Sequence, residues 1–465
     1  MNHLEILTAL CDLPTAPYCE GEVIAWLRAW SARHEGTIRN WQDKAGNVYL
    51  EYRKGRAGRG LRGLEAHRDH AGGTPVRTPA APGGPLVWEA HMDHPGFTVE
   101  RQRRDGRIEA VFRGGVKPSH FKGARVRFWL PAAGEWIASR VLEVKTVRNQ
   151  RHMKVLLTVP ARGTRLPAGT LGMWDLPEAA QRRGLFAARV CDDLAGLAAI
   201  ICALEELMAH GVRAHVVALC SRAEEVGFAG VLAACEKGWV PKGSPVIGIE
   251  TSKAFAASPQ GAGPIIRVGD RTGIFSAGLT HFLTQTAGRM ADEDGGFKYQ
   301  RKLMDGGTCN STAFAAYGYD AGGICLALGN YHNMYDRTAI GPHAPYRAPV
   351  ARAGPGIASE TISLADFEGL VRLLVETARH IGEYRPGMER SAGGCRRCTG
   401  WNRRRCYMDR PAGGLGAPRR REYRPSSCFE CFRALHFSLI LRPHSRFSQG
   451  DTSASRPRKN VVSRN

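Results

Sequence analysis

Two adjacent carboxylates follow an apolar run in this sequence, at a point where burying either of them would be costly. Glu224 and Glu225 come after "AHVVALCS" and stand before a glycine in "RAEEVGFAG". A buried carboxylate needs a compensating charge, because its removal from water is strongly unfavourable. The pair therefore raises the question of what would use two glutamates at this point of the fold.

Other acidic and histidine side chains occur where predicted strands end. These are His91 and Asp93 in "EAHMDHPG", Asp192 and Asp193 in "ARVCDDLAG", Glu250 in "VIGIETS" and His332 in "ALGNYHNM". In an open α/β sheet, ligands bind outside the carboxyl ends of the strands, so these side chains could converge there.

Each residue also has an ordinary structural interpretation. A single histidine such as His91 or His332 is more often a surface or hydrogen-bonded residue than a metal ligand. The pair 192–193 could cap the helix that begins at "LAGLAAI", and the pair 224–225 could form the acidic first turn of a helix. All of these interpretations would have to hold at once, whereas one metal site accounts for the whole set.

Two imidazoles with three or more carboxylates are the ligands that a pair of divalent cations requires, with one carboxylate bridging them. Two such cations, roughly 3.5–4 Å apart, polarise a carbonyl group and generate hydroxide at neutral pH. The chemistry also needs one carboxylate that is not a ligand, to carry the proton.

The elements that must position these residues follow an α/β rhythm. Helical spacing covers residues 3–11 and 21–34, and strands alternate with helices from "LAGLAAIICALEEL" onward. Short alternating segments between residues 101 and 186 are typical of a small all-β module. The predicted fold class is α/β, with a mostly parallel sheet, helices on both faces and an inserted small all-β domain.

The predicted domains follow from this pattern. A catalytic α/β domain comprises residues 1–100 and 187–385, and the inserted β domain comprises residues 101–186. Residues 54–85, rich in Gly, Pro, Arg and Ala, are expected to form a long surface loop. Residues 386–465 form a basic tail, rich in Arg and Cys, that is expected to be unstructured or an artefact of a shifted reading frame.

Composition excludes several classes of protein. The longest apolar run, "LAGLAAIICAL", is too short to span a bilayer, and the first residues lack the basic region of a signal peptide. We therefore expect a cytoplasmic protein with no membrane partner. The net charge of +22 does not indicate nucleic-acid binding by the core, because residues 390–465 alone hold 18 Lys and Arg against 4 Asp and Glu.

Two cysteine pairs in the tail leave alternatives open. Cys395 and Cys398, like Cys428 and Cys431, have the spacing of a structural zinc site. No convincing strand pattern surrounds them, so a zinc ribbon and a basic nucleic-acid arm remain alternatives to an unstructured tail.

The order of the motifs resembles that of a known family. "AHMD", "CDDLAG", "AEEVGFAG", "GIETS" and a late "YH" look like the tetrahedral aminopeptidases, the glutamyl or deblocking aminopeptidase family of two-metal peptidases. The segments "NVYLEYRKG", "FKYQ" and "DGGTCNSTAFAAYG" and the inserted β module match the family's layout too. The resemblance covers about residues 1–385 and identifies a divergent member.

The resemblance implies a role for each site residue. One ion would bind His91, Asp192 and Glu250, and the other would bind Asp192, Glu225 and His332, with Asp192 bridging. Glu224 would be the general base that takes a proton from the bridging water and returns it to the leaving amine, and Asp93 would orient His91. The ions would be zinc or cobalt, or manganese, since these ligands accept all three. A cis peptide between the paired aspartates and a dodecameric homo-oligomer are also implied.

The chain departs from the family at four positions. The family has Glu at His94, Arg at Leu194, Gln at Ala223 and Asp at Glu250. Glu250 can still ligate, although its extra methylene group would move the ion or the strand. His94 could be an additional ligand or proton carrier, or a neutral substitution.

The leading functional hypothesis is a two-metal aminopeptidase that hydrolyses N-terminal residues from peptides. Alternatives are a metal-dependent deacylase of N-acyl amino acids and a non-catalytic homologue. Retention of Glu224 argues against the last, because a protein without activity has no need of an acid that is not a ligand.

Overall fold

The computed structural model describes residues 1–55, 84–147, 152–335 and 355–385. Most of the expected surface loop and both cysteine pairs of the tail lie outside these residues. Within the described part, no helix is long and apolar enough to cross a membrane.

The largest sheet has eight strands in the order β1-β2-β12-β3-β13-β16-β14-β15. Its four central strands run parallel, while β2 and β14 pair antiparallel with their inner neighbours. The strands in sheet order are β1 (Ile38–Gln42), β2 (Val48–Arg53), β12 (His215–Ser221), β3 (Leu86–His91), β13 (Val246–Lys253), β16 (Ala321–Leu328), β14 (Ile265–Asp270) and β15 (Gln300–Met304).

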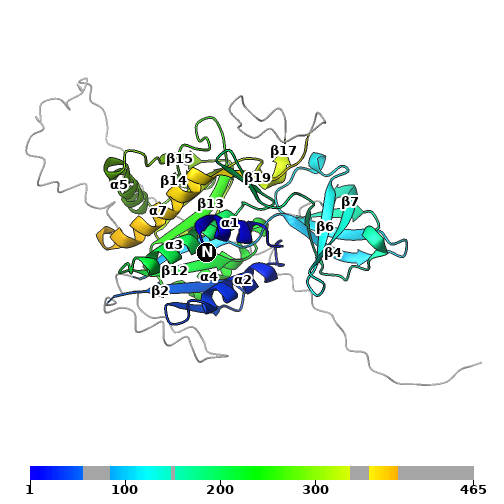
Figure 1. Cartoon of the computed structure of the whole chain (residues 1–465), viewed down its shortest axis with the longest axis horizontal. Coiled ribbons are helices and arrows are strands. Elements are labelled where there is room, and N and C mark those ends of the chain that lie inside the picture. Colours follow the sequence, from blue (N-terminus) through cyan, green and yellow to red (C-terminus); the bar gives the residue numbers. More distant parts are fainter. Residues whose placement is uncertain (56–83, 148–151, 336–354, 386–465) are drawn as a thin grey trace, which may run out of the picture. The chain divides into compact units, whose positions relative to one another are not determined.

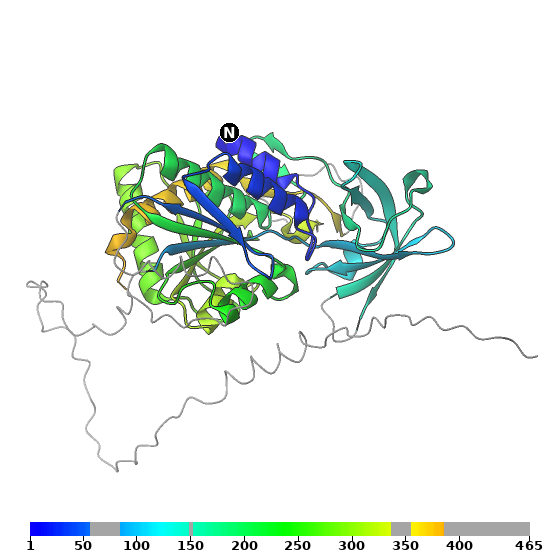
Figure 2. The same cartoon turned by 90° about the horizontal axis from the view of Figure 1, so that it is seen from below.

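Helices cover both faces of this sheet (Figures 1 and 2). The core on one face includes residues from α1 (His3–Cys11), α2 (Gly21–Ala32), α3 (Leu194–Ala209), α5 (Ala277–Glu293) and α7 (Leu364–His380). On the other face, α4 (Ala229–Lys237) and α6 (Asn310–Ala316) contribute to a second core. Strand β3 supplies Trp88 to the first core and Val87 to the second, as alternating side chains of a strand do. A strand buried on both faces reads as a nearly continuous apolar run, which explains "LVWEAH".

Between β3 and α3 the chain forms a closed antiparallel barrel, β4-β5-β8-β7-β6-β9. Its centre is packed with aromatic rings, and the centroid of Phe97 lies 4.8 Å from those of Phe112 and Trp174. The strands are β4 (Gly96–Gln102), β5 (Ile108–Arg113), β6 (Arg125–Leu130), β7 (Glu135–Thr146), β8 (His152–Leu157) and β9 (Leu171–Trp174). The predicted fold class is confirmed, and the boundaries assigned to the domains stay a prediction.

Two small sheets complete the fold. β10 (Ala180–Arg182), β11 (Leu185–Ala188) and β19 (Glu360–Ser363) form one, and β17 (Met334–Tyr335) and β18 (Gly356–Ile357) form the other. The antiparallel pairing of β11 with β19 places Glu360 opposite Ala188. A residue late in the chain thereby lies beside the segment that leads into α3.

Candidate metal centre

The predicted site residues meet at the carboxyl ends of the parallel strands. His91 is the last residue of β3, and Glu250 lies in the second half of β13. Glu225 and His332 occupy the short 3₁₀ helices η5 (Glu224–Val226) and η6 (Tyr331–Asn333), which follow β12 and β16. Asp192 stands just before α3. Parallel strands present their carboxyl ends at one edge of a sheet, so distant parts of the sequence come together there.

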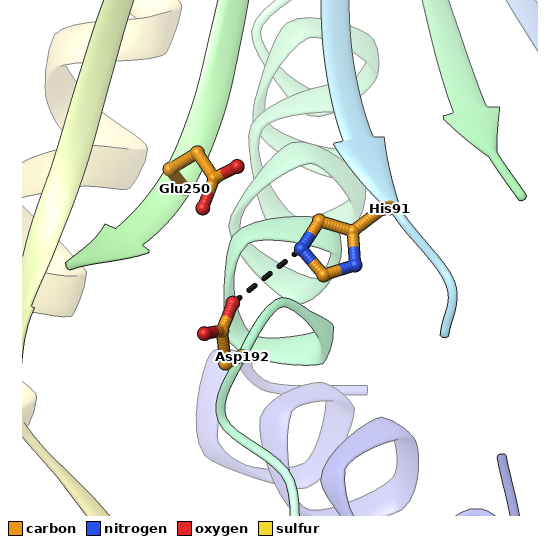
Figure 3. Close-up of side chains that lie close together, drawn as sticks. All are labelled: His91, Asp192 and Glu250. Carbon is orange, nitrogen blue, oxygen red and sulfur yellow. Dashed lines mark ion pairs between the residues drawn. The ribbon is translucent and has the colours of Figure 1, made fainter. Parts of the chain in front are cut away.

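The first group of ligand type consists of His91, Asp192 and Glu250 (Figure 3). One ligand atom from each lies within 4.8 Å of the other two, and all three side chains are buried. His91 Nε2 is 3.4 Å from Asp192 Oδ1. We call this group the first triad.

The second triad consists of Asp192, Glu225 and His332, whose ligand atoms also lie within 4.8 Å of one another. His332 Nε2 is 3.1 Å from Glu225 Oε1 and 3.4 Å from Asp192 Oδ2. Asp192 therefore belongs to both triads, with Oδ1 facing His91 and Oδ2 facing His332.

The residues of both triads fit divalent cations by their chemistry. Each triad offers one imidazole nitrogen and two carboxylate oxygens, a donor set that suits zinc, cobalt and manganese. Two imidazoles alone cannot balance the negative charge of three buried carboxylates. Bound cations would supply the missing positive charge.

Burial perturbs the titration of these groups. It raises the pKa of the Glu250 carboxyl to about 8. Burial would also raise the pKa of Asp192, but its hydrogen bonds to His332 and His91 hold that pKa below its usual range. Cations bound among these side chains would favour the ionised form of every carboxylate.

Glu224 lies beside the second triad without belonging to it. Burial raises the pKa of its carboxyl well above the usual range, and the charges of Glu250 and Glu225 act in the same direction. Strand β12 has ended at Ser221, so the two adjacent glutamates lie on a turn and not on an extended strand. The expected turn at 226–227 is present, with Gly227 at φ 110°. The acidic pair thus occupies the first turn of a helix as well as the site.

Asp93 does more than the sequence suggested. Its backbone carbonyl lies 3.0 Å from His91 Nδ1, closer than its carboxylate, which is 3.5 Å away. The carboxylate instead accepts the backbone N–H groups of Glu224 (2.9 Å) and Glu225 (3.1 Å). One buried residue therefore contacts the ligand of the first triad and fixes the turn that carries both glutamates.

Both ring nitrogens of His94 lie within hydrogen-bonding distance of an oxygen atom. Nδ1 lies 2.6 Å from the carbonyl oxygen of Asp192, and Nε2 lies 2.9 Å from Asn333 Oδ1. These contacts favour a supporting role over that of an additional ligand.

The structure also places the paired aspartates and Leu194. The peptide bond between Asp192 and Asp193 is cis, as the resemblance implied. Asp193 is the residue that caps α3, but its carboxylate makes no capping hydrogen bond. Leu194, where the family has Arg, is fully buried at the start of the helix.

Several residues around the site were missed at the level of sequence. Glu20, fully buried, pairs with Arg222 and also accepts the N–H of Ala223, so it supports the turn before Glu224. Nothing in "YCEGEV" marks Glu20 for this role. The carbonyl oxygen of Gly115 lies 3.1 Å from His332 Nδ1, and the double glycine in "FRGGVK" was a usable signal of close backbone approach.

Glu360 was missed as well. It accepts backbone N–H groups from Asp192 and His332, and nothing in the largely polar segment "ETIS" marks it for this role.

Comparison with known proteins agrees with this picture. Residues 160–342 match the model of the M42 glutamyl aminopeptidase family. No curated protein sequence matches the chain significantly. The resemblance predicted from the motifs is confirmed, and it supports the predicted enzyme class, a hydrolase of peptide bonds.

Solved aminopeptidase structures share the fold. An aminopeptidase from Desulfurococcus kamchatkensis aligns with a TM-score of 0.60 and 18% identity over 81% of this chain and 94% of that chain. The TET aminopeptidase of a marine sediment Thaumarchaeota archaeon aligns with a TM-score of 0.59 and 17% identity, over 82% of this chain and 97% of that chain. The TET1 peptidase of Pyrococcus horikoshii aligns with a TM-score of 0.58 and 17% identity, over 81% of this chain and 99% of that chain.

Proposed function

We propose that this chain, a divergent member of the glutamyl aminopeptidase family, removes N-terminal residues from peptides with the help of two divalent metal ions. One observation carries the proposal. Asp192 directs its two carboxylate oxygens to two different imidazoles, so a single side chain joins two triads of metal-ligand type. Zinc, cobalt and manganese all suit these donors.

The two triads would divide the ions between them. His91, Asp192 and Glu250 would hold one, and Asp192, Glu225 and His332 the other. When bound, two such ions polarise the carbonyl group of the scissile peptide bond and lower the pKa of water toward neutrality.

We assign proton transfer to Glu224. It precedes Glu225 of the second triad in a partly buried turn, and the backbone N–H groups of Glu224 and Glu225 are both held by Asp93. Burial raises the pKa of the Glu224 carboxyl, which suits a group that must take a proton from water and return it to the leaving amine.

A homo-oligomer is part of the same proposal. The TET1 peptidase of Pyrococcus horikoshii, which shares the fold, can assemble into a tetrahedron or a large octahedral shell. Light scattering on the full chain would test the assembly, and a monomeric mass would contradict it. A cytoplasmic location stays a prediction.

The function is tested by measuring metal content and the hydrolysis of free-amine and N-acylated substrates for wild type and Glu224→Gln. We expect the variant to keep both ions and to lose about 10²–10⁴-fold in kcat, the usual contribution of a general base. Glu51→Gln is a matched control, because Glu51 is a buried acid on β2, paired with His215.

The outcomes separate the hypotheses. Full activity in Glu224→Gln would contradict the assignment of the base. A wild-type enzyme that hydrolyses only N-acylated substrates would be a deacylase, and a wild type without bound metal would overturn the two-metal proposal.

A further inference from the structure

We propose that Glu360 is a positioning residue that sets the distance between the bridging ligand Asp192 and the ligand His332, and so tunes the affinity for metal. The inference rests on the proposed function, because it assumes that both residues bind cations. Glu360 belongs to neither triad. It acts through the backbone of the two ligands.

The contacts of Glu360 are short and reach two separate segments. Its Oε2 accepts the backbone N–H groups of Cys191 (2.7 Å) and Asp192 (2.9 Å). Its Oε1 accepts the backbone N–H of His332 (2.8 Å). The residue is completely buried. One carboxylate group therefore joins the segment before α3 to the turn after β16.

The position of β19 explains how one side chain reaches both segments. β19 pairs with β11 along one side, which places Glu360 opposite Ala188, near the segment that leads to Asp192. On its other side, Thr361 exchanges two backbone hydrogen bonds with Gly329, just before the turn that carries His332. The strand thus lies between the two ligand-bearing segments.

The turn that carries His332 needs such support. Asn330, His332 and Asn333 have φ values of 54°, 55° and 60°, in the left-handed region that residues with side chains seldom adopt. Conformations of this kind persist only where surrounding contacts impose them.

The contacts that impose this conformation come largely from the residues around Glu360. Asn330 Nδ2 donates to the carbonyl oxygen of Ser359 (2.8 Å), and Asn333 Nδ2 donates to that of Ala358 (3.2 Å). Together with the bond from Glu360 to the N–H of His332, residues 358–360 hold the turn at three points.

A carboxylate suits this place better than a neutral acceptor. Both of its oxygens accept, and hydrogen bonds from backbone N–H groups to an ionised acceptor are stronger than those to a neutral one. A glutamine has a single acceptor oxygen, and its amide N–H₂ would face at least one backbone N–H group. Substitution by glutamine would therefore loosen one ligand-bearing segment while keeping the size of the side chain.

The experiment compares wild type, Glu360→Gln and Asp366→Asn in the full chain. Asp366 is a matched control, because its buried carboxylate also accepts two backbone N–H groups, from Gly261 (2.7 Å) and Gly263 (2.8 Å), but touches no site residue. For each protein, the stepwise affinities for Zn²⁺ are measured by competition with a chelator. The thermal midpoint of the metal-free form and kcat/KM are measured alongside.

We expect Glu360→Gln to weaken Zn²⁺ binding by about 10–100-fold, the usual effect of removing a group that supports a ligand. Asp366→Asn should lower the thermal midpoint without changing Zn²⁺ affinity. A purely structural role would give both variants the same affinity as wild type. Glu360→Asp keeps the charge but shortens the reach, so it should weaken binding less; it serves as the test if Glu360→Gln does not fold.

The outcomes distinguish this inference from the function on which it rests. Wild-type affinity in the Glu360 variants, alongside a wild type that binds two ions, would overturn the positioning role alone. A wild-type protein that binds no Zn²⁺ would overturn the proposed function and this role together.

Discussion

The two triads share Asp192 and contain the same kinds of ligand, but the chain holds them in different ways. In the first triad, His91 of β3 pairs with Ser221 of β12, and Glu250 of β13 pairs with Cys325 of β16. Glu225 and His332 of the second triad lie on 3₁₀ turns of three residues each. Ladder pairing thus fixes two members of the first triad, whereas Glu225 and His332 of the second triad lie outside the strands.

Carboxylates outside the second triad replace the missing ladder. Asp93 accepts the N–H of Glu225, and Glu360 accepts the N–H of His332. The difference shows that the same donor chemistry can be fixed by regular secondary structure or by buried side chains that bond to the backbone. We infer that supporting residues matter more for the second triad, and variants can separate the two.

The largest effect is expected for Asp192→Asn, because it acts on both triads at once. An amide offers one acceptor oxygen and no charge, so it cannot serve two cations as a carboxylate can. Removing a supporting group usually lowers metal affinity by about 10–100-fold, and we expect a larger loss of metal affinity here. Activity should fall to background. Metal content after dialysis and peptide hydrolysis measure the two effects.

Asp43→Asn is the control for Asp192→Asn, since Asp43 is a partly buried acid in the turn between β1 and β2. Retention of two tightly bound ions by Asp192→Asn would show that the triads do not depend on a shared ligand.

A smaller and more selective effect is expected for Asp93→Asn. The variant loses one of the two acceptors that hold the N–H groups of Glu224 and Glu225, while β3 and β13 still hold the first triad. We expect a loss of about 10–100-fold in kcat/KM, with weaker binding of one ion and little change for the other. Stepwise Zn²⁺ titration measures this split. Equal loss of affinity for both ions would show that the two triads do not differ in this way.

Much of the fold and the site could be predicted because their signals are local. The apolar runs before His91, Glu225, Glu250 and His332 predicted strands, and polar residues after strands predicted their convergence. The helix of "LAGLAAIICALEEL" is apolar all round and is buried accordingly. The role of each ligand came from the order of motifs in the family and stays a prediction.

The supporting residues could not be predicted because their partners are backbone groups. Glu360 accepts hydrogen bonds from the backbone N–H groups of Asp192 and His332. Almost every residue has such a group, so the residue type gives no sign of the contact. The resemblance assigned Asp93 to the support of His91, yet its carboxylate mainly holds a turn more than a hundred residues later. Such contacts depend on tertiary pairing, which no local pattern encodes.

The smallest effect is expected for Gly115→Ala. Gly115 follows β5 of the barrel, and its carbonyl oxygen bonds to His332, a ligand of the second triad. A Cβ on Gly115 would lie 3.2 Å from His332 Nδ1, whose hydrogen bond to the Gly115 carbonyl oxygen is 3.1 Å long. The imidazole must shift by a few tenths of an ångström, so we expect a loss in Zn²⁺ affinity smaller than that of Glu360→Gln, which is about 10–100-fold. Gly273→Ala is the control, because its Cβ would meet no atom within 4 Å. If Gly115→Ala weakened the ion of the first triad instead, the second triad would not be the one that depends on its neighbours.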